Sequence, residues 1–160
     1  MGFGWLFHGG KPMNCSFAPA AEEDVPQILE QGRALIRQYE DLSSLPAEEI
    51  FAWMERKTSR FLGEYRRILA DGETAGWIRL HEEDGQLELD DLYLLPRFQN
   101  RGIGTWALEH ILSEYSGPIF FYVFTGNTRA IRLYERLEFR VRESVSPTRL
   151  IMERKNGARP

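Results

Sequence analysis

The segment 92–105, Leu-Tyr-Leu-Leu-Pro-Arg-Phe-Gln-Asn-Arg-Gly-Ile-Gly-Thr, carries the residues of this chain best suited to bind a phosphate. A strand-like run ends at a proline, and Gly102 and Gly104 then open a helix-like run. The first amides of a helix have no internal acceptor and lie at the positive end of the helix dipole. Glycines let a ligand approach these amides, so the spacing favours a phosphate site, with Arg97 and Arg101 adding positive charge.

A glycine pair in a strand-to-helix turn also occurs where the turn alone requires it, so the pair by itself leaves a purely structural role open. A P-loop would need a lysine after the second glycine, where Thr105 and Trp106 follow instead. A dinucleotide-binding fold would need a carboxylate near the end of the next strand, and 121–126 contains none. A nucleotide-binding oxidoreductase is therefore the weaker interpretation.

Length and composition limit the classes of protein that this chain can belong to. Its 160 residues suit one domain, and an apolar content of 42% can form a core, which excludes a disordered chain. The net charge of −4 is a poor match to nucleic acid phosphates, and no apolar run approaches the ~20 residues that span a bilayer. The single cysteine, Cys15, excludes an internal disulfide and suits a cytoplasmic location.

Hydrophobic periodicity predicts an α/β (α+β) domain with a mixed, mostly antiparallel sheet and helices on both of its faces. The expected helices cover 21–40, 46–60, 103–115 and 130–137. The expected strands cover 16–18, 65–69, 75–80, 87–95, 119–124, 139–145 and 148–154. The nearly all-apolar run 119–124 indicates a strand buried on both faces, so it forms a parallel β-α-β unit with 87–95.

The two ends of the chain are expected to lie outside this domain. We place the domain at 16–155, after an N-terminal arm at 1–15 and before a tail at 156–160. The first ten residues are apolar through side chains such as Trp5 and Phe7, but they lack the basic start of a secretion signal. A loose arm and an arm that docks on the body or on a partner both stay open.

Two motifs in this chain resemble those of the GCN5-related N-acetyltransferase (GNAT) superfamily. The family's Gln/Arg-x-x-Gly-x-Gly/Ala motif is similar to Gln99-x-x-Gly102-x-Gly104. Its second coenzyme segment is similar to Asn127-x-x-Ala130-x-x-x-Tyr134-x-x-x-x-Phe139. The resemblance covers 16–154. One departure is Glu138, where the family commonly has glycine, and a left-handed backbone there would cost on the order of 1 kcal/mol.

The resemblance implies an acetyl-CoA-dependent N-acetyltransferase with acetyl-CoA as cosubstrate. No metal is expected, because the histidines and Cys15 show no metal-ligand spacing. Backbone N–H groups of 100–105 would hold the pyrophosphate, and the backbone of Leu92 and Leu94 would pair with the pantetheine like an added strand, where the two parallel strands splay apart. Asn127 would contact the coenzyme, although a plain helix N-cap explains this residue equally well. The implied coenzyme residues are Leu92, Tyr93, Leu94, Gln99, Asn100, Arg101, Gly102, Ile103, Gly104, Thr105, Asn127 and Tyr134.

The resemblance also implies the groups that move protons. Tyr134 matches a family tyrosine that lies near the sulfur as general acid, and a core aromatic is the alternative. Glu88 and Asp90 share one face of their strand by alternation and are the candidate bases, unless both are simply solvated. Asp91 is expected to face the other side, and Tyr122 is an unlikely base because an unperturbed tyrosine has a pKa of ~10.

The acceptor would be a primary amine of a small molecule or a peptide. The family builds its acceptor pocket from the first two helices, where Trp53 and Arg56 lie. Six acids within 82–91 favour a cationic acceptor as much as a solvated hairpin. We expect no nucleic acid or membrane partner, and exposed sheet edges are compatible with a homodimer. A non-catalytic acetyl-CoA-binding module remains the main alternative to an enzyme.

Overall fold

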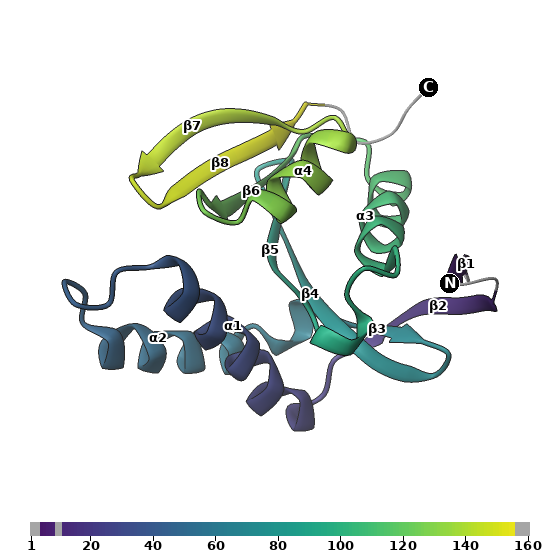
Figure 1. Cartoon of the computed structure of the whole chain (residues 1–160), viewed down its shortest axis with the longest axis horizontal. Coiled ribbons are helices and arrows are strands. Elements are labelled where there is room, and N and C mark those ends of the chain that lie inside the picture. The colour runs from purple at the N-terminus through teal and green to yellow at the C-terminus, as the bar shows by residue number, and fades with distance from the viewer. Residues whose placement is uncertain (1–3, 9–10, 156–160) are drawn as a thin grey trace.

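The computed structural model describes residues 4–8 and 11–155, whose strands form one mixed sheet (Figure 1). Within these residues eight strands follow the order β1-β2-β3-β4-β5-β6-β8-β7. The strands are β1 (Gly4–His8), β2 (Lys11–Pro19), β3 (Tyr65–Ala70), β4 (Glu73–Glu83), β5 (Gln86–Leu94), β6 (Ile119–Phe124), β7 (Arg140–Ser146) and β8 (Arg149–Arg154). The helices are α1 (Val25–Tyr39), α2 (Ala47–Arg60), α3 (Ile103–Glu114) and α4 (Thr128–Arg136), with single 3-10 turns at Glu22–Asp24, Leu62–Glu64 and Pro96–Phe98.

The predicted fold class is confirmed, because the neighbouring strands run antiparallel except for β5 and β6, which are parallel and joined through α3. The first strand differs from its prediction at 16–18: it begins at Lys11 and pairs with β1 on one side and β3 on the other. Local pattern gives little signal for such a strand, since its length depends on its partners. Residues 4–8 of the expected arm form β1, whereas 1–3, 9–10 and the expected tail at 156–160 lie outside the described residues.

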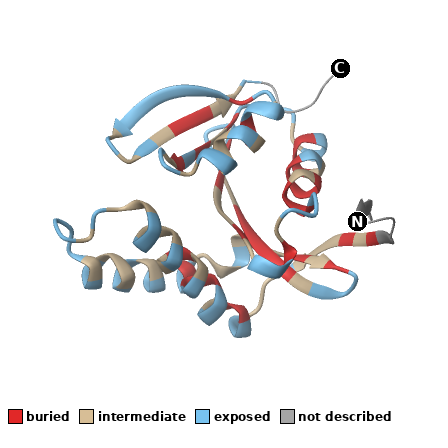
Figure 2. Ribbon diagram, in the orientation of Figure 1, coloured by how far each residue is buried: buried red, intermediate tan, exposed pale blue. Residues whose placement is uncertain are grey.

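Helices cover both faces of the sheet, as predicted (Figure 1). On one face, α3 contributes Ile103, Leu108 and Ile111 to the main core. On the opposite face, Ile28 of α1 packs in a smaller cluster with Trp77 of β4 and with two tyrosines of β3 and β5. Figure 2 shows the buried residues gathered on the central strands and on the inner sides of the helices. The two clusters fix the helices against β4 and β5, the strands that carry the candidate site.

The pairing of β4 with β5 contains a β-bulge in the middle of the candidate site. Arg79 pairs with Asp90 and the preceding Ile78 pairs with Leu92, so Asp91 is the extra residue on β5. Asp91 accordingly adopts a left-handed backbone with φ of 55°. A bulge interrupts the alternation of side chains between the two faces of a sheet. Facing predictions made from simple alternation therefore fail at this point of the strand.

The parallel strands β5 and β6 pair over a very short length. The register joins only Leu87 with Ile119 and Glu88 with Phe120, although both strands continue for several more residues. Beyond Glu88 the two strands diverge, which leaves the β6-facing edge of β5 without a strand partner in the described chain. Unpaired backbone groups on a strand edge are ready hydrogen-bond partners for an extended ligand.

The turn after α4 resolves the question raised by Glu138. This residue adopts the left-handed region with φ of 69°, so the chain keeps the geometry that usually favours glycine. The amides of Glu138 and Phe139 both donate hydrogen bonds to backbone carbonyls of the last turn of α4. The chain therefore keeps the left-handed turn with a non-glycine residue, and these hydrogen bonds accompany its backbone strain.

Gly76 of β4 allows the close contact of β4 with the end of β5. A Cβ atom at this position would lie 1.9 Å from the carbonyl oxygen of Tyr93. We expect Gly76→Ala to lower the free energy of unfolding by about 1–3 kcal/mol, because the strands must shift to accept the methyl group. Chemical denaturation measures this, with Gly63→Ala as the control, since no heavy atom lies within 4 Å of its added Cβ. Equal losses in both variants would contradict the prediction.

Candidate functional site

The loop between β5 and α3 has the geometry that the glycine motif predicted. Gly102 is the N-cap of α3 with a left-handed φ of 78°, and Asn100 is also left-handed with φ of 61°. The chain enters α3 through these two left-handed residues. The amides of the first residues of α3 have no acceptor within the helix, as at any helix start. Gly104 is buried, and a Cβ there would lie 3.5 Å from Leu94. The local structure is therefore a cradle of backbone donors at a positive helix end.

A cavity of about 830 Å³ opens beside this loop, and we call it the glycine-loop cavity. Its lining contains eleven of the twelve predicted coenzyme residues, which are Leu92, Tyr93, Leu94, Gln99, Asn100, Gly102, Ile103, Gly104, Thr105, Asn127 and Tyr134. The exception is Arg101, whose guanidinium carbon lies 5.7 Å from the centre of the Phe98 ring. Arg97 is also absent from the lining, and its exposed side chain lies 3.6 Å from Glu73.

The positive charge of the glycine-loop cavity comes from α4 instead. Arg129, Arg132 and Arg136 line it, and no carboxylate is among its lining residues in the described chain. Their spacing of three and four residues places them on one side of the helix. Sequence reasoning missed this row, although the three arginines lie between the motif residues Asn127 and Phe139. The cavity thus combines backbone donors and guanidinium groups, which suits a ligand with several phosphates.

Arg129 also ties α4 to the glycine loop. Its guanidinium donates hydrogen bonds to the side-chain oxygens of Gln99, at 3.3 Å, and of Asn100. Gln99 in turn donates from Nε2 to the carbonyl oxygen of Leu94 at 3.0 Å. Asn127 accepts a hydrogen bond from the amide of Ala130 at 3.3 Å, so the N-cap role is present. Both motifs are therefore parts of one connected structure.

Tyr134 lies where the glycine-loop cavity meets a second cavity of about 430 Å³. This second cavity, the inter-strand cavity, lies between the diverging ends of β5 and β6 and is lined by Leu89–Tyr93 and Tyr122–Phe124. The Tyr134 ring packs against Phe121 with centres 3.8 Å apart, and no described residue hydrogen bonds to its hydroxyl. Burial raises the pKa of Tyr134 above its ordinary value, so the hydroxyl keeps its proton at neutral pH.

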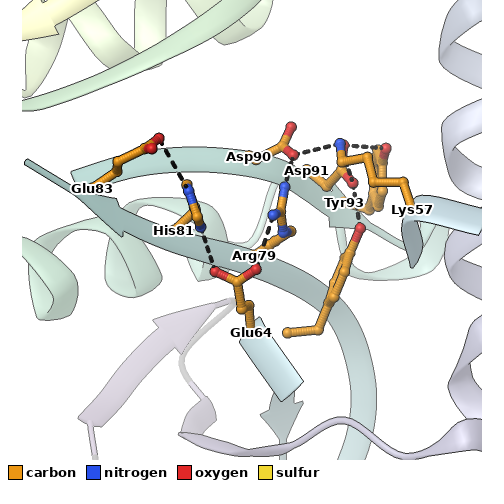
Figure 3. Close-up of polar contacts among 9 residues, drawn as sticks. Lys57, Glu64, Arg79, His81, Glu83, Asp90, Asp91 and Tyr93 are labelled. Carbon is orange, nitrogen blue, oxygen red and sulfur yellow. Dashed lines mark hydrogen bonds and ion pairs between the residues drawn. The ribbon is translucent and has the colours of Figure 1, made fainter. Parts of the chain in front are cut away.

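The bulge in β5 gives the two aspartates a common partner on α2 (Figure 3). Lys57 Nζ lies 2.5 Å from an oxygen of Asp90 and 3.7 Å from one of Asp91. Asp91 also accepts hydrogen bonds from the hydroxyls of Tyr65, at 2.6 Å, and Tyr93, at 2.8 Å. The expectation that Asp91 faces away from Asp90 was therefore wrong, because the extra residue of the bulge breaks the alternation.

The two candidate bases have different surroundings. Burial alone would raise the pKa of Asp90, but Lys57 and Arg79 hold it below its ordinary value. No hydrogen bond or ion pair joins Glu88 to another described residue, and burial together with the charge of Asp90 raises the pKa of Glu88. Glu88 is thus the carboxylate better able to accept a proton, although both residues line the third cavity described below.

A third cavity of about 630 Å³, the α2 cavity, lies between α2 and the strands β4, β5, β6 and β8. Glu88 is in its lining, and it shares residues such as Asp90 and Tyr122 with the inter-strand cavity. Behind it Glu64 joins Arg79, at 2.9 Å, to His81, at 2.6 Å (Figure 3). The hydrogen bond that His81 donates to the Glu64 carboxylate raises the pKa of His81. The three cavities therefore follow one another from the glycine loop to Glu88.

The described residues offer neither a metal centre nor a membrane span. No group of three His, Cys, Asp or Glu among them could hold a metal ion. None of the described helices is both long and apolar enough to cross a bilayer. Cys15 is buried, and burial raises the pKa of its thiol to about 11, so it is a poor nucleophile.

The sequence of this chain was compared with models of known protein families. The model of the acetyltransferase (GNAT) family matches residues 29–139. The chain belongs to this family. The match contains the glycine loop, Glu88 and Tyr134, whereas Arg149, which lines the α2 cavity and the inter-strand cavity, lies beyond it.

Similar proteins agree with the family assignment. A mycothiol acetyltransferase of Streptomyces griseus is 32% identical over 110 residues, which are 65% of this chain and 33% of that protein. The chain thus spans about a third of that relative's length. The PaiA N-acetyltransferase of Thermoplasma acidophilum, solved with coenzyme A, has a TM-score of 0.63 and 22% identity, covering 88% of this chain and 98% of that one. The ribosomal-protein-S18-alanine N-acetyltransferase of Escherichia coli gives 0.63 and 19%, covering 91% and 96%. These two likenesses show a GNAT fold.

Lys57 stabilises two adjacent carboxylates, and its removal is therefore expected to cost stability in a pH-dependent way. Lys57→Met keeps most of the stem but raises the pKa values of Asp90 and Asp91, which lowers the free energy of unfolding by about 1–3 kcal/mol at pH 7. The deficit should shrink as the pH falls and the carboxyls protonate, first Asp91, whose pKa is raised, and then Asp90. Urea denaturation at several pH values measures it. Arg56→Met is the control, because this exposed neighbour has no ion pair with any residue that the structure describes. A deficit independent of pH would contradict the assignment.

Proposed function

We propose that this chain is an acetyl-CoA-dependent N-acetyltransferase that transfers the acetyl group directly to a primary amine. The observation that carries the proposal is the continuous series of cavities from the glycine loop, past Tyr134, to Glu88. A donor with a long polar arm fits one end of this series and an amine fits the other. The two substrates would meet in the inter-strand cavity, so no covalent enzyme intermediate is needed.

The glycine-loop cavity fits the phosphates of the coenzyme. Amides of 102–105 at the start of α3 would donate to the pyrophosphate, and the guanidinium groups of Arg132 and Arg136 add charge-assisted contacts. Arg129 holds Gln99 and Asn100 in place, which keeps the loop in its binding shape. The absence of carboxylates from the described lining also suits a polyanion.

The unpaired edge of β5 fits the amides of the pantetheine arm. Alternate residues between Leu89 and Leu94 direct their backbone groups away from β4, toward the gap that opens after β5 and β6 separate. An extended arm with amide groups can pair with such an edge as a strand does. An arm that extends from the glycine-loop cavity into this gap would place its thioester near Tyr134, because Tyr134 lines both the glycine-loop cavity and the inter-strand cavity.

Glu88 and Tyr134 supply the proton transfers that the reaction needs. Acetyl-CoA provides the acetyl group as a thioester, so a C–N bond forms at the carbonyl carbon as the C–S bond breaks. Glu88, with its raised pKa and no partner, accepts the proton of the amine, directly or through one water. Tyr134 remains protonated at neutral pH and donates to the leaving sulfur. Asp90 stays ionised between Lys57 and Arg79 and acts on Glu88 through its charge.

Coenzyme binding should depend on the arginines of α4 and not on those of the loop. We expect acetyl-CoA, but not NAD, to raise the melting temperature, since the cleft offers no dinucleotide fingerprint. Arg132→Gln combined with Arg136→Gln should raise the Kd for acetyl-CoA about tenfold, measured by calorimetry. Arg97→Gln is the matched control, because its side chain is outside the cavity. A larger effect of the control, or stabilisation by NAD alone, would reject the proposed binding mode.

Glu88 should control the acidic limb of the rate profile. In the parent, kcat/KM for amine-dependent CoA release is expected to rise with pH through a pKa above the ordinary glutamate value, because the base must first lose its proton. Glu88→Gln should lower kcat about a hundredfold and remove this limb. Glu82→Gln, exposed on the same hairpin and outside the cavities, should behave as the parent does. A protein that binds acetyl-CoA but releases no CoA with any amine would instead be a binding module.

A further inference from the structure

The α2 cavity has an unusual charge balance for a site that accepts an amine. Its lining contains five residues with a permanent positive charge, which are Arg56, Lys57, Arg60, Arg79 and Arg149. Only three carboxylates line it, Glu83, Glu88 and Asp90. The acidic run in the sequence left a cationic acceptor open, but Glu82 and Asp84 are outside the lining and Asp91 is held by two tyrosines. The walls of the cavity are therefore basic.

The ion pairs inside the cavity leave most of this positive charge uncompensated. Asp90 is shared by Lys57 and Arg79, with contacts of 2.5 Å to each. Glu83 lies 3.5 Å from His81, which is a part-exposed neighbour in the same lining. Two of the three carboxylates thus already have partners, and only Glu88 remains, in the position proposed for the base.

Three guanidinium groups in the lining have no carboxylate partner in the described chain. Arg149 of β8 lies over the rings of Tyr122, at 5.2 Å, and Phe124, at 5.5 Å. Arg60 lies 5.2 Å from the ring of Phe61, and no ion pair joins Arg56 to a described residue. Packing over a ring holds a guanidinium in place while its N–H donors stay available in the plane of the guanidinium itself. The donors come from α2 on one wall and β8 on the other.

Arg79 adds a buried donor to the same cavity. The side chain is 6% exposed, and its Nε atom has no hydrogen-bond partner although the rest of the guanidinium contacts Glu64 and Asp90. Glu64 and Asp90 already match the charge of Arg79, so this residue adds to the polar lining while the unpaired positive charge comes from the outer arginines.

Exposed aromatic rings complete the lining. Trp53 is 54% exposed and Tyr122 is 44% exposed, and both border the α2 cavity and the inter-strand cavity. Large aromatic side chains that stay open to solvent beside polar groups are common in ligand sites. They offer an apolar surface between the proposed base and the outer guanidinium groups.

We propose that the acceptor is an amine that also carries an oxyanion group, a carboxylate or a phosphate, which the arginines of the α2 cavity bind. This inference rests on the proposed function, because it names the substrate class of that site. Arg56, Arg60 and Arg149 hold the oxyanion through charge-assisted hydrogen bonds, and the amine points to Glu88. The oxyanion also balances the positive walls, so a zwitterionic acceptor enters where a purely cationic one is repelled.

The test compares matched amines with and without the oxyanion. The value of kcat/KM for CoA release is measured at low salt for the common α-amino acids against their α-amides, for phosphoethanolamine against ethanolamine, and for 1,4-diaminobutane. We expect at least one acid or the phosphate to exceed its neutral partner about tenfold, and the arm that responds distinguishes carboxylate from phosphate. In the double variant Arg56→Gln/Arg149→Gln this preference should fall below about threefold, and in the parent it should weaken as the salt concentration rises. It should persist in the control Arg142→Gln, which changes a charge outside the cavity.

Each outcome bears on one of the two proposals. Acetyl transfer that favours the neutral amines or the diamine in every pair would overturn the oxyanion inference and leave the acetyltransferase intact. A preference for acids that survives in the folded double variant would overturn the assignment to these arginines. Acetyl-CoA binding without CoA release for any amine would overturn the proposed function, and the inference with it.

Discussion

The early separation of β5 from β6 is the constraint on which the rest of this structure depends. Two parallel strands normally satisfy each other's backbone groups along their shared length, but here the pairing ends after Glu88. The bulge at Asp91 bends β5 at the same place, and β6 instead completes its pairing with β8. The gap that results is deep, bordered by polar backbone, and flanked by the start of α3. The proposed pairing with the pantetheine arm and the proposed meeting of the two substrates both use this gap.

The charged residues beside the gap have two distinct tasks. Lys57 and Arg79 compensate the carboxylates that the bulge brings together, so that Asp90 and Asp91 can stay in a largely buried place. Glu88 lies two residues earlier and receives no such partner. The same cluster therefore stabilises one carboxylate in its ionised form and leaves a neighbour poised to exchange a proton. The surroundings of the two carboxylates, and not their residue type, distinguish Asp90, which stabilises the structure, from Glu88, the proposed base.

Both ends of the series of cavities are basic, although the chain as a whole has a net charge of −4. At one end three arginines of α4 face the glycine loop, and at the other the guanidinium groups of α2 and β8 face the acceptor side. Local potential in a cleft depends on the few groups that line it, so net charge is a poor guide to what binds there. A negatively charged protein can thus present basic walls both to the phosphates of the proposed donor and to the oxyanion of the proposed acceptor.

The sequence by itself determined the order of elements, the parallel β-α-β unit, the glycine loop and the second motif with Asn127 and Tyr134. These features are local: periodicity, a proline, two glycines and motif spacing all act within a few turns of chain, and their geometry follows from short-range sterics and hydrogen bonds. Alternation also placed Glu88 and Asp90 on one face of β5, because the bulge begins only after Asp90.

Only the tertiary structure decided three features: the direction of the Asp91 side chain, the arginines of α4 that line the glycine-loop cavity, and the positive charge of the α2 cavity. A bulge depends on how two strands are paired, so alternation could not foresee that Asp90 and Asp91 would share Lys57. Arg97 and Arg101 are nearest to the loop in sequence, yet α4 folds over it and brings Arg129 closer. Charge complementarity is a property of residues distant in the chain, and packing alone determines which of them meet.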